Sequence, residues 1–223
     1  MQVCEPVPSW GTTRGFFRTL LSYKRMNQSG TADVIRSKAR NLFSSNGFDA
    51  TTVRHITSAA KVNLGAITYH FGSKQALYES ILEQVFDDLA DRIEQAAATD
   101  GTPAQRLRAI VASFFWFFRG SPDAPLLVIR ELARGAPPPA PVVPRVRRVL
   151  AAISSVIQEG QRAGEFRPLE PFLGAFTLVS QCVWFAVAGP HMPAMLGLPV
   201  PAAELRSRME SHIADVVIRS VIL

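Results

Sequence analysis

Apolar side chains recur three and four residues apart along most of the chain, which is the period of an amphipathic α-helix. The first such series is Ile35, Ala39, Leu42 and Phe43, and Gly47 follows it as a residue suited to a left-handed helix end. No segment shows the strict alternation of apolar and polar residues that is typical of a half-buried strand. The pattern therefore predicts an all-α protein.

Two short helices are predicted to follow the first one. Thr51 or Thr52 is a suitable N-cap for the first of them. Asn63 is expected to cap the second, which should end near Phe71. A longer supporting helix followed by two short helices and a tight turn forms a helix-turn-helix unit. We therefore predict a three-helix, helix-turn-helix DNA-binding domain over residues 31–77.

Positive charge is concentrated in the same part of the chain. Residues 1–77 contain ten Lys or Arg and three Asp or Glu, whereas residues 78–223 contain fourteen Arg and fifteen Asp or Glu. The excess charge behind the overall net value of +6 thus lies in the first third of the sequence. A basic module attached to a nearly neutral body is typical of a nucleic-acid-binding protein.

The predicted DNA contacts lie on the second short helix, which would enter the major groove, and at neighbouring helix N-termini. Gly65 and Ala66 permit close approach, and Asn63 and Thr68 can hydrogen-bond to base edges. Free backbone N–H groups at helix starts attract phosphates, and Lys74 adds a full charge at one of them. The predicted set is Thr51, Thr52, Arg54, Asn63, Leu64, Gly65, Ala66, Thr68, Tyr69, His70 and Lys74.

The segment from Ile35 to Leu77 resembles the DNA-binding domain of the TetR family of transcriptional repressors. The resemblance implies that Thr52, His70 and Lys74 contact phosphates and that residues 63–68 face the bases. The amino-acid sequence of residues 63–71 is similar to that of the CecR-like branch of the family. The matching positions are Leu42, Phe43, Gly47, Phe48, Thr51, Thr52 and the run Tyr69, His70, Phe71, Gly72, Ser73 and Lys74.

The remaining residues, 78–223, are predicted to form a helical ligand-binding and dimerisation domain. In the resembled family the last two long helices pack against their symmetry mates as a four-helix bundle. Residues 169–188 and 202–221 have the length and apolarity for that role, and a lone monomer would expose a large apolar area. The other helices are expected at residues 77–100, 107–119, 126–134 and 145–163.

The same domain contains aromatic residues suited to an apolar pocket, which would bind a hydrophobic small molecule. Arg130 is expected either to meet an anionic group there or to pair with Glu131 or another carboxylate. Ordinary core packing is the alternative for every member of the set. The predicted ligand-binding residues are Phe114, Phe115, Trp116, Phe118, Arg130, Gln181, Trp184, Phe185, His191 and Met192.

Residues 1–30 lack clear periodicity and are predicted to be a disordered or arm-like N-terminal extension.

A membrane span, a metal site and a cofactor site are not expected. The apolar run 172–187 has sixteen residues, fewer than the roughly 20 that usually span a membrane, so a buried interface helix is predicted and no membrane. Two distant cysteines and four dispersed histidines predict no metal site, and no cofactor is expected.

These features predict a cytoplasmic, ligand-responsive repressor that binds a palindromic operator as a homodimer and is released by a hydrophobic small molecule. The sequence contains none of the common catalytic motifs, so an enzyme is not expected. Two alternatives stay open. One is a helical small-molecule-binding dimer without sequence-specific DNA binding, and the other is a transcriptional activator.

Overall fold

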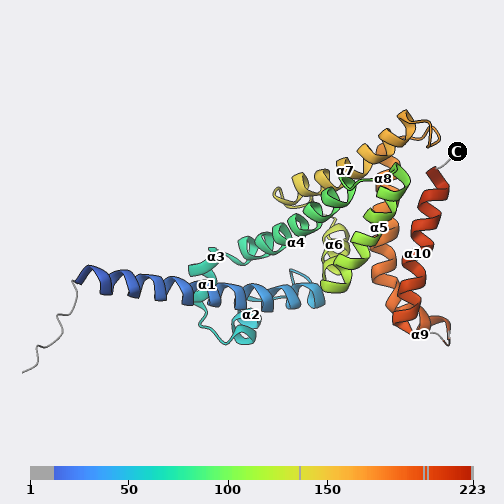
Figure 1. Ribbon diagram of the computed structural model, residues 1–223. Coiled ribbons are helices and arrows are strands. Elements are labelled where there is room, and N and C mark those ends of the chain that lie inside the picture. Colours follow the sequence, from blue (N-terminus) through green and yellow to red (C-terminus); the bar gives the residue numbers. More distant parts are fainter. Residues whose placement is uncertain (1–12, 136, 198, 200, 222–223) are drawn as a thin grey trace, which may run out of the picture.

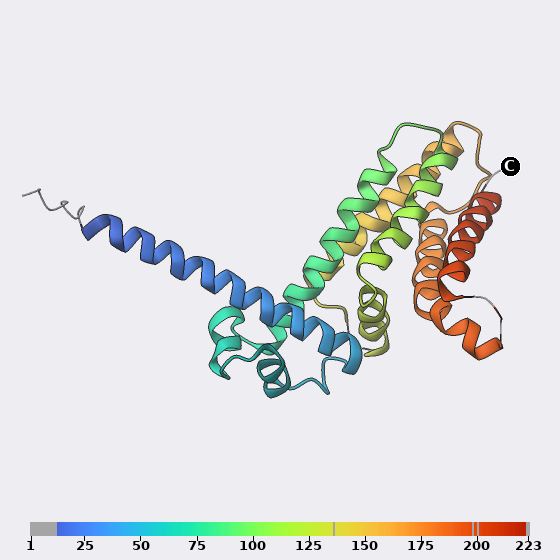
Figure 2. The same cartoon turned by 60° about the horizontal axis from the view of Figure 1, so that its bottom comes forward.

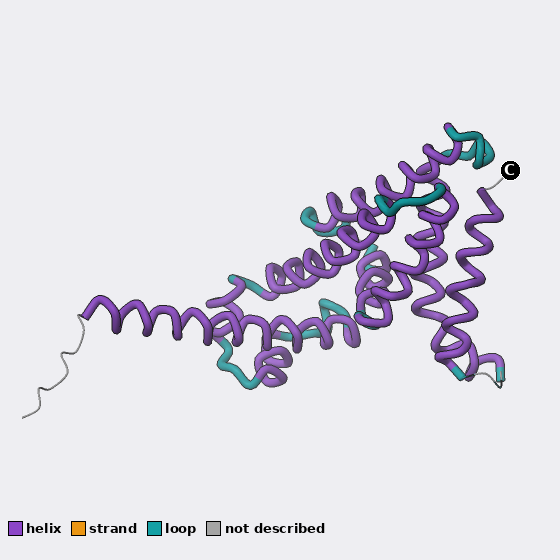
Figure 3. The backbone as a smooth tube through the Cα atoms, viewed as in Figure 1, coloured by secondary structure: helices purple, strands orange, loops and turns teal. Residues whose placement is uncertain are grey.

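The computed structural model describes residues 13–135, 137–197, 199 and 201–221, and every regular element in these ranges is a helix (Figure 3). The all-α prediction is confirmed. The helices are α1 (Thr13–Asn46), α2 (Val53–Ala60), α3 (Gly65–Phe71), α4 (Lys74–Ala97), α5 (Pro103–Gly120), α6 (Ala124–Ala133), α7 (Val142–Arg162), α8 (Pro171–Ala188), α9 (Met192–Leu196) and α10 (Ala202–Val221), with a 3-10 turn at Gly189–His191.

The C-terminal part of α1 packs with α2 and α3 into a three-helix unit, which we call the head (residues 31–73; Figure 1). Its apolar core consists of fully buried residues of all three helices. Phe48, in the loop after α1, places its ring 4.9 Å from the Tyr78 ring of α4. The head therefore shares aromatic packing with the helix that leads into the rest of the molecule, the body (residues 74–221).

The ends of the short helices explain the turns of the head. The Thr52 side chain caps α2 by accepting from the backbone N–H of His55, whose ring in turn accepts from the backbone N–H of Thr52. The Ser73 side chain caps α4 by accepting from the backbone N–H of Ala76 at 3.0 Å. The expectation that Asn63 caps α3 is wrong, because α3 begins at Gly65 and the preceding Leu64 is already helical without a side-chain cap.

Helix α1 is much longer than the sequence pattern predicts. The apolar period begins near Thr31, yet the helix starts at Thr13, so residues 13–30 of the predicted disordered or arm-like extension are helical. Residues 1–12 of that extension lie outside the described residues. Figures 1 and 2 show this first half of α1 projecting beyond α2 and α3 as a single rod. No proline interrupts residues 13–46, so the backbone hydrogen bonds of a helix can continue where the apolar period gives no signal.

The body is built around α4, which leaves the head and packs along α7, while α5 packs between α4 and α10 (Figures 1 and 2). Helices α8 and α10 lie on the side away from α4. Charged contacts join α4 and α7: Arg148 bonds to Asp91 and Glu94 at 2.6 Å each, and Arg145 bonds to Asp87 at 2.9 Å. The hydrogen bonds to Glu94 and Asp91 raise the pKa of Arg148.

The two helices predicted to form a dimer interface differ in what they leave exposed. Among the described residues, Pro171–Leu196 is the one stretch long and apolar enough to cross a membrane, and only 28% of its most apolar window is buried. Helix α8 buries Ala175, Leu178 and Cys182 but exposes a row of large apolar side chains. Helix α10 instead buries Val217, only 6% exposed, against its own protomer.

The close crossing beside Gly160 gives a first prediction. A Cβ atom added at Gly160 would lie 2.6 Å from Cγ of the buried Phe166 ring. Gly160→Ala should therefore lower the free energy of unfolding by about 1–3 kcal/mol. Gly120→Ala is the matched control, since nothing lies within 4 Å of its Cβ position and the residue is helical. Thermal unfolding of both variants measures the difference, and equal melting temperatures would contradict the packing.

Candidate DNA-binding surface and effector cavity

The exposed face of α3 carries most of the predicted DNA-binding residues. Leu64 is 53% exposed and Tyr69 is 69% exposed, and Asn63, Gly65 and Thr68 are exposed beside them. On α2, Thr52 and Arg54 are also exposed. An exposed helix with small residues and hydroxyl or amide groups near its start has the shape and chemistry needed to approach base edges in a major groove.

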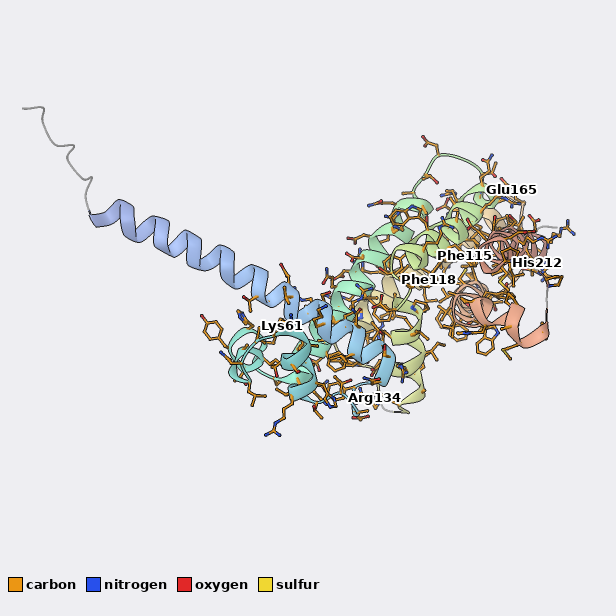
Figure 4. All side chains as sticks on the ribbon, turned by 90° about the horizontal axis from the view of Figure 1, so that it is seen from below. Lys61, Phe115, Phe118, Arg134, Glu165 and His212 are labelled. Carbon is orange, nitrogen blue, oxygen red and sulfur yellow. The ribbon has the colours of Figure 1, made fainter. Side chains whose placement is uncertain are left out.

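A hollow of about 510 Å³ runs along the start of α3. Asn63, Ala66 and His70 line one part of it, and Thr31 of α1 and Lys61 line another. Lys61, labelled in Figure 4, ends α2 in a left-handed conformation with φ of 55° and is exposed. The hollow thus combines hydrogen-bonding groups of α3 with a lysine side chain, which suits a nucleic-acid backbone.

Two of the predicted DNA contacts have structural roles that the sequence pattern does not reveal. Thr51 is fully buried and its hydroxyl donates to the backbone oxygen of Gly47 at 2.7 Å, so Thr51 does not belong to the exposed surface. The Lys74 ammonium donates to the backbone oxygens of Phe48 and Thr51, both at 2.9 Å. Lys74 thereby ties the start of α4 to the loop between α1 and α2.

The body contains an apolar cavity of about 300 Å³ between α4, α5, α6, α7 and α8. Of the predicted ligand-binding residues, Phe114 and Phe118 line it. Fifteen of its seventeen lining residues are apolar, and the other two are Glu131 and Arg147. The cavity is large enough for a small molecule, because pockets for such ligands begin at about 300 Å³.

The other predicted ligand-binding residues lie elsewhere. Phe115 and Phe185 lie with Phe118 around a separate cavity of about 80 Å³. Figure 4 labels Phe115 and Phe118. Trp116 is 52% exposed, and the guanidinium of Arg92 lies 3.5 Å from the centre of its ring. Four more line neither cavity: Trp184 and His191 are exposed, and Gln181 and Met192 are half-buried.

Arg130 is also not a cavity residue. Its guanidinium donates to the backbone oxygens of Ser44, at 2.7 Å, and of Ser45, in the last turn of α1. The last carbonyls of a helix have no partner within the helix and carry partial negative charge, so an arginine is favourable there. Gly47 follows with φ of +83°, and a Cβ atom at this position would lie 3.4 Å from the Arg130 side chain.

Sequence reasoning missed most of the cavity wall. Helix α4 contributes Phe86 and Leu89, both of which are buried. The helical period indicates an inward position for Leu89, but it does not show that Leu89 faces a cavity. Helix α7 contributes apolar residues that the sequence predicts to point inward, among them Val146 and Leu150. A single helical stripe therefore serves both as core and as cavity wall, and the pattern of one helix cannot separate the two uses.

Glu131 lies at the polar end of the cavity and is only 6% exposed. Its carboxylate accepts a hydrogen bond from the hydroxyl of Tyr78 at 2.7 Å and one from Arg134 at 3.3 Å. Burial and the bond to Glu131 raise the pKa of Tyr78. Because the Tyr78 ring also packs 4.9 Å from the ring of Phe43, one short chain of contacts joins the cavity to the head.

Helix α6, which carries Glu131, is held against α1 at both of its ends. Asp123, at its start, accepts two hydrogen bonds from the guanidinium of Arg40. Arg130, near its end, holds the last turn of α1. Figure 4 shows Arg134, which follows α6, beside the end of α1. Helix α6 is thus both a wall of the cavity and a support of the DNA-binding head.

Comparison with known proteins identifies the class to which this fold and surface belong. The family model for bacterial regulatory proteins of the tetR family matches residues 35–81, and the model for the tetracyclin repressor-like C-terminal domain matches residues 103–217. The chain therefore belongs to the TetR family, as the sequence resemblance implies. It is a DNA-binding transcriptional regulator and not an enzyme.

Individual relatives are similar over most of their length. The transcriptional repressor NicS of Pseudomonas putida is 24% identical, over 86% of this chain and 92% of its own. The repressor KstR2 of Mycolicibacterium smegmatis is 27% identical, over 74% and 84%. The regulator RutR of Escherichia coli is 23% identical, over 86% and 91%.

Solved structures share the fold. The ketosteroid regulator KstR2 of Mycobacterium tuberculosis superposes with a TM-score of 0.69 at 19% identity, over 86% of this chain and 95% of that one. AibR, solved with isovaleryl coenzyme A and operator DNA, gives 0.68 at 17% identity, over 82% and 97%. A tetR-family protein from Rhodococcus RHA1 gives 0.72 at 21% identity, over 86% and 96%.

The contacts of Lys74 give a second prediction. Lys74→Met should lower the free energy of unfolding by about 1–3 kcal/mol, because two backbone oxygens lose a charged donor. Lys38→Met is the control, since Lys38 is exposed on α1 of the same head. Chemical denaturation compares the two variants. If Lys74→Met is as stable as Lys38→Met, the two hydrogen bonds of Lys74 contribute nothing to the free energy of unfolding. The role of Lys74 would then be limited to the predicted phosphate contact.

Proposed function

We propose that this protein is a transcriptional repressor that binds a palindromic operator as a homodimer and leaves it when an apolar small molecule fills the cavity. The observation that carries the proposal is the double role of α6. This helix contributes Glu131 and Leu132 to the cavity and holds α1 of the DNA-binding head through Asp123 and Arg130. The proposed place of action is the cytoplasm, where bacterial regulators of this family meet DNA.

The mode of DNA binding follows from the head. Exposed Gly65 and Thr68 allow α3 to lie in a major groove, and the N-terminus of α2, beside the exposed Thr52, presents the positive end of the helix dipole. The net positive charge of residues 1–77 adds the electrostatic attraction that DNA binding needs. This charge favours the repressor over the alternative of a ligand-binding dimer that does not bind DNA.

The exposed face of α8 is the proposed subunit interface. Phe172, Phe176 and Trp184 are each more than half exposed. Phe172 and Phe176 lie one turn apart and Trp184 two turns further along the same side of α8, whose opposite face is buried. An apolar row of this size is unusual on the surface of a soluble monomer. A second copy of the chain presents the same row and can cover it by two-fold symmetry. Two heads then face one DNA duplex, which is why a palindrome is expected.

The proposed release works through the position of α6. A ligand that fills the cavity presses on Leu132 and Glu131, and α6 cannot move without shifting its bonds to Arg40 and to the end of α1. A change in the angle of each head alters the distance between the two α3 helices. Coupling of roughly 1–3 kcal/mol between the two sites is enough to change operator affinity by 5- to 150-fold.

Selection of binding sites from a random DNA pool tests the operator. The full chain should enrich inverted repeats whose half-sites lie about 10–10.5 bp apart, or a multiple of that distance. Binding should weaken steeply as salt is raised, since phosphate contacts release counterions. Enrichment of no sequence, or of single half-sites only, would contradict the proposal. The position of the operator relative to a promoter then distinguishes repression from activation.

The same operator tests the release. An apolar probe such as 1-decanol should lower operator affinity of the wild-type protein. Asp123→Asn should bind the probe equally well but lose much of its effect on DNA, because the Arg40 contact that transmits the movement is weakened. Calorimetry measures probe binding, and fluorescence anisotropy measures DNA binding. An undiminished effect in Asp123→Asn would show that the signal does not pass through this ion pair.

The dimer interface gives a third variant to test. Trp184→Glu should convert the dimer to monomers, because burying an unpaired carboxylate costs about 3–5 kcal/mol in each subunit. The monomer should stay folded, since Trp184 is 61% exposed in the protomer. Val217 is unsuitable because it is buried in its own protomer. Sedimentation measures the mass, with Val34→Glu, an exposed site on α1, as control. A dimeric Trp184→Glu protein would place the interface elsewhere.

A further inference from the structure

The interior of the effector cavity has no free hydrogen-bonding group among the described residues that line it. Apolar side chains of α4, α5, α7 and α8 form its walls, and the one buried charge, Glu131, is already bonded to Tyr78 and Arg134. A polar ligand atom placed inside would lose its hydrogen bonds to water without gaining a partner in the protein, which lowers the free energy gained on binding. The part of a ligand that enters the cavity must therefore be apolar.

The rim of the cavity has a different character. Leu132, 72% exposed, lines the cavity and also faces solvent, so it marks where the cavity opens. Arg147 lines the same opening and is exposed. The rim thus places one guanidinium and an exposed apolar side chain at the entrance to an apolar interior.

Arg147 differs from its neighbours on α7. Arg145 and Arg148 are bound by the acidic residues of α4. Successive residues of a helix point about 100° apart, so Arg147 faces away from those acids. It has no hydrogen-bond or ion-pair partner in the part of the chain that the structure describes. The arginine at the opening is therefore available to a ligand.

We propose that the effector is an amphiphilic anion: an apolar chain that fills the cavity and ends in a carboxylate or phosphate group, which Arg147 binds at the opening. The inference rests on the proposed function, in which this cavity is the effector site. A guanidinium forms two parallel charge-assisted hydrogen bonds with either group. The cavity volume of about 300 Å³ lies at the lower end for small-molecule pockets, which suits a single chain of medium length.

Calorimetric titration with four ten-carbon probes tests the charge of the ligand. Decanoate and decyl phosphate carry the proposed anion, 1-decanol is neutral, and decylamine is cationic at pH 7. The wild-type protein should bind at least one of the two anions about tenfold more tightly than 1-decanol. The comparison between decanoate and decyl phosphate shows which head group fits. Equal affinity for anions and 1-decanol, or tighter binding of decylamine, would overturn the proposal.

Variants at position 147 test whether Arg147 binds the anionic group. Arg147→Gln should weaken binding of the preferred anion about tenfold and leave 1-decanol unchanged, and Arg147→Lys should retain part of the preference. Arg162→Gln, at the end of the same helix and outside the cavity lining, is the matched control. An Arg147→Gln protein that keeps the full preference for the anion would overturn the assignment of Arg147.

A third variant tests whether the probes bind in this cavity. Leu150→Trp adds bulk to the wall and should abolish binding of decanoate and 1-decanol alike, with its melting temperature confirming that it is folded. Anion binding that survives in Leu150→Trp would overturn the proposal. Failure of the amphiphilic-anion proposal is distinguishable from failure of the proposed function. If 1-decanol binds and releases the protein from the operator, the cavity is an effector site even when the anions bind no more tightly than 1-decanol.

Discussion

The attachment of α6 to the end of α1 is the constraint on which the rest of the structure depends. Asp123 and Arg130 lie at the two ends of α6 and hold two different turns of α1. Two separated attachments fix the direction of a helix as well as its position, so the head has a defined angle relative to the body. The bonds of Arg130 also satisfy carbonyls that the end of α1 would otherwise leave to water.

This constraint connects the apolar cavity with the DNA-binding surface without a long chain of contacts. Glu131 follows Arg130 directly in α6, so one residue faces the head and the next faces the cavity. Tyr78 bonds to Glu131 and packs against Phe43 and Phe48 of the head, which adds a second route through α4. Close packing makes such a junction respond as a unit, because side chains in contact cannot shift independently.

The fold was predictable from sequence to a large extent because the helices are amphipathic and their ends carry residues with strong local preferences. Thr52, Ser73 and Gly47 mark helix ends through side-chain caps or a left-handed conformation, which are local effects. The start of α1 was not predictable in this way. A helix that projects away from its neighbours needs no apolar period, so residues 13–30 gave no such signal.

The site was less predictable, because its decisive contacts join residues that are distant in sequence. The aromatic run 114–118 gave two cavity residues, Phe114 and Phe118, but the same run places Trp116 at the surface. Arg130 offers the same sequence signal whether it meets a ligand, a carboxylate or a helix end, and only the arrangement of α1 beside α6 decides among these. Arg147 shows the converse case. Its two neighbours are held by acids of α4, and the helical rotation that turns it away from those acids also brings it to the cavity opening.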